Sequence, residues 1–309
     1  MTIQQQQKTM TWAMALPLLA VLIWSLNLTV TRYAADYISP VSISFYRWLI
    51  AFIVLTPWVA PRVWQSRKQI RPYLTQLAVL GACGMVLYQG LAYSAAHYTT
   101  ATNMGVINAF IPVFTLLIGI IILKDRPNRF ALIGSALSFL GLLYLISQGQ
   151  WQNLLHLAGH WGDLLMLAAV FCYAFYGVFL KKWQIDLPLL LSIYMQIGFS
   201  LLFHLPFVFA LGLDGLNREN LGSVLYAGIF PSILAPLVWM LAIQFLGPNR
   251  TSIFMNITPI LTAIIACVWL GEVWSMAHSI GGVIILLGIL LAQKTNAPTR
   301  ASAVLKQQS

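Results

Sequence analysis

Long apolar runs alternate with short polar gaps along the whole chain. Each run is roughly 20 residues long, the length that crosses the hydrocarbon core of a bilayer. Apolar residues within a run are continuous and do not alternate with a period of two, which predicts helices and not the strands of a barrel. The ten predicted runs are Trp12–Thr31, Val41–Ala60, Tyr73–Ala96, Thr99–Leu123, Phe130–Ser147, Gly162–Leu180, Leu189–Leu211, Leu221–Leu246, Arg250–Leu270 and Met276–Gln293. The pattern predicts an all-α polytopic membrane protein with ten transmembrane helices.

Composition supports this interpretation. Hydrophobic residues make up 60% of the chain and charged residues 8%, whereas a soluble domain carries about 25% charged residues. Ten helices use nearly the whole length, so no soluble catalytic domain is expected. Cys83, Cys172 and Cys267 all fall inside apolar runs, which argues against disulfides and a metal site. With no nucleotide-binding, zinc or nucleophile motif in view, we expect no cofactor and no enzymatic activity.

The basic residues indicate an orientation. Of the 17 Lys and Arg residues, Arg32 and Arg218 fall in gaps on one side of the predicted membrane and Arg47 lies within the second run. All the others fall on the opposite side, at the two chain ends or in gaps. Cytoplasmic segments carry such an excess, so both termini are expected in the cytoplasm of a multi-pass inner (plasma) membrane protein. The formal charge of +10 is therefore interpreted as a topology signal and not as a nucleic-acid surface.

The two halves of the chain resemble each other. At a constant offset of 147, the coinciding pairs are Pro112 and Pro259, Thr115 and Thr262, Asp125 and Glu272, Gly134 and Gly281, and Gly141 and Gly288. At an offset of 149, Trp24 and Asn27 coincide with Tyr173 and Tyr176. Each half holds five helices, an odd number, so the second copy must be inverted in the membrane. The sequence predicts two inverted five-helix repeats, residues 12–147 and 162–293, an arrangement that permits alternating access.

With these patterns in view, the chain resembles the drug/metabolite transporter superfamily in its EamA-domain family. The resemblance covers about residues 12–293 and rests on the segment RWLIAFIVLTPWV and on the repeated order of proline, acid and two glycines. In the first half, Lys124 and Asp125 stand where the second half has the more family-like Gly271 and Glu272. The resemblance implies ten helices, transport of small organic metabolites or drugs, often export, and a central cavity between the halves.

Polar and aromatic residues inside the runs are the candidates for solute binding, because burying them in lipid is costly. Rings and neutral amides on both halves suit an amphipathic solute such as an amino acid or a drug. The predicted binding residues are Trp24, Asn27, Gln89, Tyr93, Asn108, Tyr173, Tyr176, Met240, Gln244 and Asn256. For any single residue, packing between helices is the competing explanation. Pro112, Pro259, Pro231 and Pro236 are predicted as gating or kink positions.

The charged residues bear on coupling. No acid is placed at mid-membrane, and Asp125 and Glu272 are expected to cap the helix that follows each of them. For Arg47 a structural role, with its side chain reaching the surface, is favoured over an anchor for a solute carboxylate. His204 is expected to bond to a neighbouring helix more readily than to carry protons. Facilitated diffusion, solute exchange or coupling through a histidine such as His204 therefore remain the predicted mechanisms.

Other functions stay open at this point. A channel, an intramembrane enzyme, and a non-transporting receptor or assembly protein are the alternatives to a carrier. The expected partners are a small-molecule solute and membrane lipid, without nucleic acid, and a homodimer is left open. The sequence determines neither the solute and its direction of transport nor the coupling ion.

Overall fold

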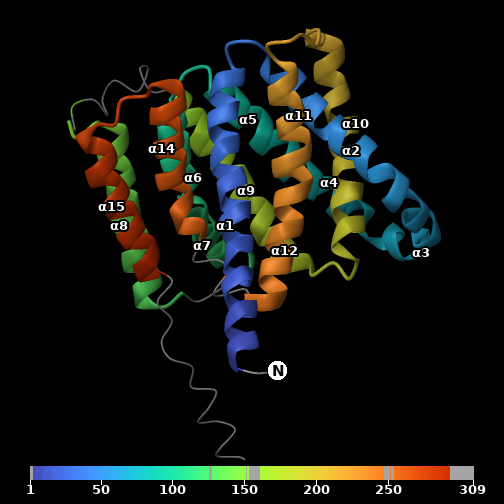
Figure 1. Ribbon diagram of the computed structural model, residues 1–309, viewed down its shortest axis with the longest axis horizontal. Helices are drawn as coiled ribbons and strands as arrows, with labels where there is room; N and C mark the ends of the chain where they lie inside the picture. The colour runs from blue at the N-terminus through green and yellow to red at the C-terminus, as the bar shows by residue number, and fades with distance from the viewer. Residues whose placement is uncertain are drawn as a thin grey trace, which may run out of the picture.

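The computed structural model describes residues 3–124, 127–150, 152, 161–246, 251 and 254–292, and nearly all of them are helical. In Figure 1 the long helices stand side by side, with the N-terminal end at the bottom. The helices are α1 Ile3–Ala34, α2 Pro40–Gln65, α3 Arg67–Ile70, η1 Arg71–Tyr73, α4 Leu74–Gly81, η2 Ala82–Leu87, α5 Tyr88–Ala95, α6 Ala101–Asn108, α7 Ile111–Ile122, α8 Arg129–Ile146, α9 Trp161–Trp183, α10 Leu189–Leu211, α11 Leu221–Ile229, η5 Phe230–Leu234, α12 Ala235–Leu246, η6 Phe254–Ile257, α14 Thr258–Leu270 and α15 Met276–Ala292.

Among the described residues, eight continuous helical segments are long and apolar enough to cross a membrane. Each of these eight corresponds to one of the first eight predicted runs, so the all-helical, multi-pass prediction is confirmed. Two further apolar helices, Phe254–Leu270 and Met276–Ala292, are shorter. At 1.5 Å per residue, about 17 residues span roughly 25 Å, less than a core of about 30 Å. The count of ten transmembrane helices therefore stays a prediction. The predicted start of the ninth run, Arg250, lies outside the described residues.

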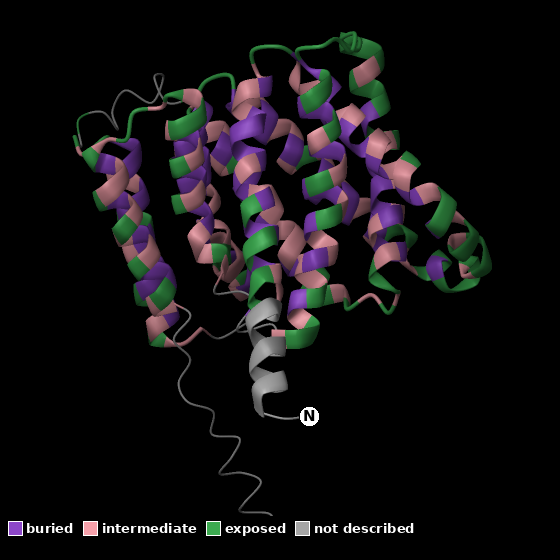
Figure 2. Cartoon of the chain, viewed as in Figure 1, coloured by how far each residue is buried: buried purple, intermediate pink, exposed green. Residues whose placement is uncertain are grey.

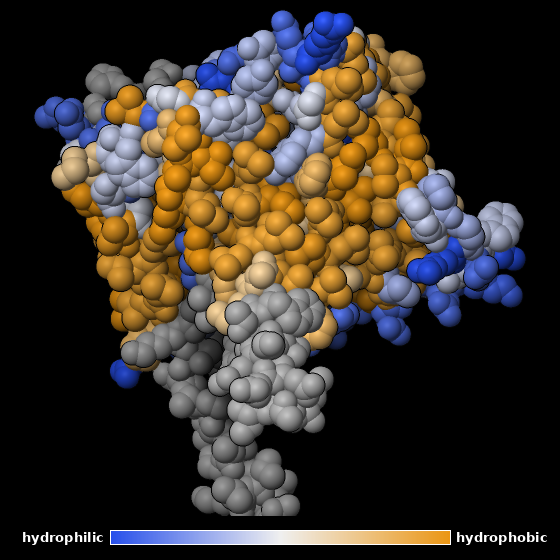
Figure 3. Space-filling model, in the orientation of Figure 1, coloured by the Kyte–Doolittle hydropathy of each residue, from blue (hydrophilic) through white to orange (hydrophobic). Residues whose placement is uncertain are grey.

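The outer surface has the character expected in lipid. On the face shown in Figure 3, a broad apolar band crosses the middle of the bundle, and hydrophilic residues gather at its upper edge and near α3 at the right. Phe209 and Val268 are each 84% exposed, which would be unfavourable in water. Figure 2 shows that exposed residues cover the outward faces of the helices while buried residues face between them.

Local sequence explains where several helices begin. Ser39, Thr100 and Asn128 stand just before α2, α6 and α8, and each side chain accepts a hydrogen bond from a backbone N–H of the first turn. Such caps satisfy N–H groups that have no partner inside the helix. Pro112 and Pro259 each occupy one of the first two positions of α7 and α14, where the missing N–H costs nothing.

Two membrane-spanning segments are interrupted by a turn of wider π-helix. The segment η2 separates α4 from α5, and η5 separates α11 from α12. Gly84 in η2 and Pro231 in η5 differ by 147 in number, the offset of the internal repeat. Wide turns of this kind redirect side chains and occur often at functional sites.

The glycines of the repeated motif bring α8 and α15 into close contact at the left edge of the bundle (Figure 1). A Cβ added at Gly288 would lie 2.5 Å from the carbonyl oxygen of Gly134, and one at Gly141 would lie 3.0 Å from that of Gly281. These small residues therefore allow the two helices to pack closely together. Because Gly134 is close to Gly288 while Gly141 is close to Gly281, the two equivalent helices run antiparallel.

The packing of the other helices follows the same duplication. In the first half α1 packs against α12 and α14, and in the second half α9 packs against α5 and α7. The helices α2 and α10, at matching places in the halves, pack against each other. The first helix of each half thus packs against helices of the other half. This reciprocal packing supports the predicted inverted relation between residues 12–147 and 162–293. It also leaves a space in the middle that both halves line.

Candidate solute-binding cavity

A cavity of about 440 Å³ lies between the two halves, within the range of about 300–1,000 Å³ usual for small-molecule sites. Helices from both halves contribute, including both π-helical turns. The lining residues are Trp24, Asn27, Leu28, Arg47, Trp48, Gly84, Met85, Tyr88, Gln89, Asn108, Ile111, Tyr173, Tyr176, Leu189, Ile193, Pro231, Ser232, Pro236, Trp239, Met240, Ile243, Met255 and Thr258.

Tyrosine rings form one wall of the cavity. The rings of Tyr88 and Tyr173 lie 4.7 Å apart between centroids, and those of Tyr173 and Tyr176 stack at 5.3 Å. The hydroxyl of Tyr88 donates a hydrogen bond of 3.1 Å to Oδ1 of Asn108 at the end of α6. The wall therefore presents aromatic faces for an apolar group beside an amide for a polar one.

Two tryptophans form a second wall. Trp24 and Trp239 meet edge to face with centroids 5.4 Å apart, and Nε1 of Trp24 donates to the carbonyl oxygen of Pro231 at 3.4 Å. One turn along α1 from Trp24, Oδ1 of Asn27 is buried and accepts no hydrogen bond from a described residue. An unpaired acceptor in a cavity wall is costly unless a ligand or water supplies a donor.

Arg47 of α2 occupies the polar side of the cavity and is 3% exposed. Its Nε donates to Oγ of Ser232 at 2.7 Å. Its Nη1 donates to Oε1 of Gln89 at 3.0 Å and to the hydroxyl of Tyr93 at 3.2 Å. The guanidinium therefore ties α2 to α5 in its own half and to η5 in the other half. The expectation that Arg47 extends to the membrane surface was wrong, because polar partners in the bundle hold it inward.

The structure brings together most of the predicted binding residues. Those that line the cavity are Trp24, Asn27, Gln89, Asn108, Tyr173, Tyr176 and Met240, with Pro231 and Pro236. Those that are not among the lining residues are Tyr93, Gln244 and Asn256, with Pro112 and Pro259. Tyr93 is buried behind Arg47, while Gln244 is exposed on α12. Whether any of these residues binds solute remains a prediction.

Sequence reasoning missed several lining residues. Tyr88 and Trp48 lie next to Gln89 and Arg47 in the chain, but hydrophobic patterning alone does not distinguish a cavity face from a lipid face. Ser232 directly follows Pro231. A proline inside an apolar run predicts irregular backbone, and irregular backbone in a membrane helix must face protein or a cavity, so Ser232 could have been predicted as a lining residue. The hydroxyl of Ser232 donates to the carbonyl oxygen of Ala227 at 2.7 Å and so supports the π-helical turn.

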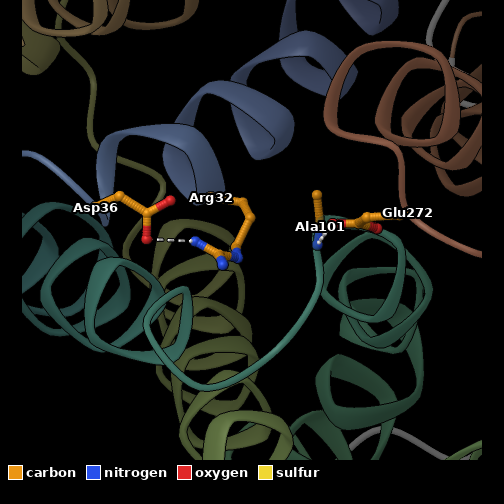
Figure 4. Close-up of polar contacts among 4 residues, drawn as sticks. All are labelled: Arg32, Asp36, Ala101 and Glu272. Atoms are coloured by element: carbon orange, nitrogen blue, oxygen red, sulfur yellow. Dashed lines mark hydrogen bonds and ion pairs between the residues drawn. The ribbon is translucent and has the colours of Figure 1, made fainter. Parts of the chain in front are cut away.

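A polar cluster joins the halves at the end of the bundle opposite the N-terminus. The carboxylate of Glu272 accepts hydrogen bonds from the backbone N–H groups of Ala101 and Thr102 at 2.7 and 3.0 Å, and from the Thr102 hydroxyl at 2.6 Å. Figure 4 shows the bond to Ala101 near the ion pair between Arg32 and Asp36. Glu272 was expected to cap the helix that follows it. It caps α6 of the other half instead, and Asp125 lies outside the described residues.

Further polar contacts extend this cluster. Asp163, in the first turn of α9, accepts bonds from Thr99 and from Nδ2 of Asn103. Oδ1 of Asn103 in turn lies 2.9 Å from Nε2 of His278 on α15. The described acids thus lie in loops or in the first turn of a helix. Within the bundle, Nε2 of His204 lies 2.9 Å from Oγ of Ser44 on α2, the bond to a neighbouring helix that was predicted.

The duplicated packing around a central cavity agrees with comparison to known proteins. The model of the EamA-like transporter family matches residues 11–147 and again residues 160–293. The chain belongs to the EamA-like transporter family. As a member of this family it is a multi-pass membrane transporter, and the resemblance drawn from its motifs is confirmed.

Relatives agree with this assignment, and a solved structure shares the fold. The chain is 27% identical to the uncharacterized transporter YyaM of Bacillus subtilis, over 84% of this chain and 87% of that protein. It is 24% identical to a probable terminal-alkyne amino-acid exporter of Streptantibioticus cattleyicolor, over 94% of this chain and 96% of that protein. A solved crystal structure with 16% identity superposes with a TM-score of 0.57, over 92% of this chain and 97% of that one, which supports the fold.

Proposed function

We propose that this EamA transporter carries a small organic solute through the central cavity by alternating access. The observation that carries the proposal is the position of the cavity, which lies between two halves with duplicated packing. Transporters built from inverted repeats place their solute site at the repeat interface and alternate by moving one half against the other. The similarity to a probable amino-acid exporter favours amino acids or comparable amphipathic metabolites as solutes and export as the direction.

The lining of the cavity extends toward one end of the bundle, and this bears on whether the cavity faces the cytoplasm or the outside. Its lining reaches Leu189, the first residue of α10, and Ile243, near the end of α12. Both lie at the end of the bundle where α1 begins. At the opposite end Glu272 and Asp163 bind residues at the start of α6 or just before it. With the predicted orientation, in which both termini are cytoplasmic, the cavity extends toward the cytoplasm and the polar cluster closes the external side.

Counterflow in proteoliposomes tests the proposal. A mixture of radiolabelled amino acids and small metabolites is offered to vesicles preloaded with the same unlabelled compounds. A carrier gives saturable uptake that rises with internal solute, whereas a channel gives non-saturable flux. The absence of protein-dependent uptake of any component would contradict the proposal.

Two variants test whether the cavity is the route. Asn108→Ala and Tyr176→Ala should weaken transport because both residues line the cavity, while the protein still reaches the membrane and keeps its thermal stability. Gln244→Ala is the matched control, because Gln244 is exposed on α12 and its loss should leave transport unchanged. If the first two variants lose stability but keep normal apparent affinity, their role is packing and the proposed site is wrong.

A further inference from the structure

Arg47 is the one charged side chain among the described residues that line the cavity. No Asp or Glu of the described residues lines the cavity, and none of them forms a salt bridge with Arg47. A buried cation without an anionic partner is costly, even when neutral groups accept its hydrogen bonds. Ionisable residues inside membrane proteins are rare and mark solute or ion pathways. The uncompensated charge therefore suggests that an anion completes the site.

The hydrogen bonds of the guanidinium leave one nitrogen available. An arginine side chain has five N–H donors, one on Nε and two on each Nη nitrogen. Nε binds Ser232, and the two N–H groups of Nη1 are used by Gln89 and Tyr93. Nη2 has no acceptor among the described residues. Two N–H donors on a fixed cation thus lie beside the cavity without a partner among the described residues.

The partners of Arg47 hold this nitrogen in place. Ser232 uses its single hydroxyl proton to bind the carbonyl oxygen of Ala227, so its oxygen is oriented as an acceptor for Nε. The guanidinium carbon also lies 5.1 Å from the centre of the Trp48 ring. A cation held from three sides binds an anion without first losing side-chain entropy.

We propose that the transported solute carries a carboxylate, that Nη2 of Arg47 binds this carboxylate, and that the apolar part of the solute lies against Trp24, Trp239 and Tyr173. This inference rests on the proposed function and specifies its solute class. One cation matches one negative charge, so a singly charged carboxylate fits better than a doubly charged phosphate. No lining acid is available to pair with an ammonium group, so an amine is not required and a cationic solute is repelled.

Three probes of nearly equal shape test the charge requirement on the purified full-length protein in neutral detergent. They are 3-phenylpropionate, its uncharged amide 3-phenylpropionamide, and the cation 3-phenylpropylamine. Binding is measured by the change in tryptophan fluorescence, since Trp24, Trp48 and Trp239 line the cavity. Both the carboxylate and the amide can accept a hydrogen bond from Nη2, but only the carboxylate brings a negative charge to the guanidinium. The carboxylate should therefore bind at least about tenfold more tightly than the amide. The amine should not compete.

Variants assign the preference to Arg47. Arg47→Gln should remove it, so that carboxylate and amide bind alike, while Arg47→Lys should keep a weaker preference because the charge remains. Arg32→Gln is the matched control, because Arg32 lies at the end of α1 and pairs with Asp36, and it should leave the preference unchanged. The comparison of the three probes on the unaltered protein stands even if a variant fails to fold.

The outcomes separate this inference from the proposed function. Equal binding of carboxylate and amide by the unaltered protein, or no binding of any probe, overturns the assignment of Arg47. So does a carboxylate preference that persists in Arg47→Gln. Saturable counterflow of other solutes would then leave the transport proposal intact. A clear carboxylate preference without any counterflow would instead support the Arg47 site and contradict transport.

Discussion

Replacing Gly288 by alanine tests whether the contact between α8 and α15 depends on the absence of a side chain. The added Cβ would lie 2.5 Å from the carbonyl oxygen of Gly134 and 2.5 Å from the backbone nitrogen of Ser138. Unstrained contacts of this kind need about 3.5 Å. Gly282 lies on the same helix, and a Cβ there meets no atom of another described helix within 4 Å. Gly282→Ala is therefore the matched control.

The expected magnitude follows from these distances. Both substitutions gain about 1 kcal/mol of helix propensity, and this gain cancels when the two variants are compared. To relieve the contacts at Gly288, the helices must separate by about 1 Å, and overpacking of this kind costs about 1–3 kcal/mol. Separation also weakens the bond of 3.1 Å from Oγ of Ser138 to the carbonyl oxygen of Ile285, worth about 0.6 kcal/mol in membrane bundles. Gly288→Ala should therefore be about 2–4 kcal/mol less stable than Gly282→Ala.

Thermal unfolding in mild detergent, followed by tryptophan fluorescence, measures the difference. A loss of this size should lower the midpoint by several degrees relative to Gly282→Ala. Gly134→Ala should behave like Gly288→Ala, because the two glycines face each other across the interface. Equal midpoints for Gly288→Ala and Gly282→Ala would refute the reasoning, since the helices would then not depend on close backbone approach.

Three further predictions concern the ends of the bundle. Glu272→Gln should lower the free energy of unfolding by about 1 kcal/mol, because a negative charge at the start of α6 is lost. Glu219 is exposed, so Glu219→Gln is the control and should have no effect. Equal melting temperatures of the two variants would contradict the role of Glu272 as a cap. The hydrogen bonds from Ser39 lower the pKa of Asp214 below its usual 3.8. The stability that the Asp214 carboxylate contributes is therefore fully present above about pH 3.8, and it is lost as the pH falls through the lowered pKa. Asp214→Asn should remove this acid-dependent part of the melting curve, and an unchanged profile would argue against it. A reporter fused after Ser309 should be active only in the cytoplasm, and an external signal would overturn the orientation inferred from Lys and Arg.

The sequence predicted the elements well because the membrane restricts the choices. Lipid offers no hydrogen bonds to the backbone, so a continuous apolar run such as Leu189–Leu211 has to be a helix. The glycines of the repeat, including Gly134 and Gly288, could be read as packing positions, because close approach of helices in lipid requires small residues. The first eight runs correspond to membrane-crossing segments for this reason.

The sequence predicted less completely which face of each helix lines the cavity. Tyr93 and Gln244 are both polar residues inside apolar runs, yet one is buried behind Arg47 and the other is exposed. Periodicity defines a face of a helix but not the neighbour that this face meets. That neighbour depends on how the two halves are placed against each other.

The sequence by itself determined the helical membrane fold, the internal repeat and the family, because these follow from local hydrophobicity and from residues at fixed spacing. Only the tertiary structure decided the partners of the charged residues. Arg47 bonds to Gln89, Tyr93 and Ser232, and Glu272 caps α6, a helix 171 residues away along the chain at Ala101. A charged side chain takes the partners that folding brings within about 3 Å, and distance along the chain does not limit that choice.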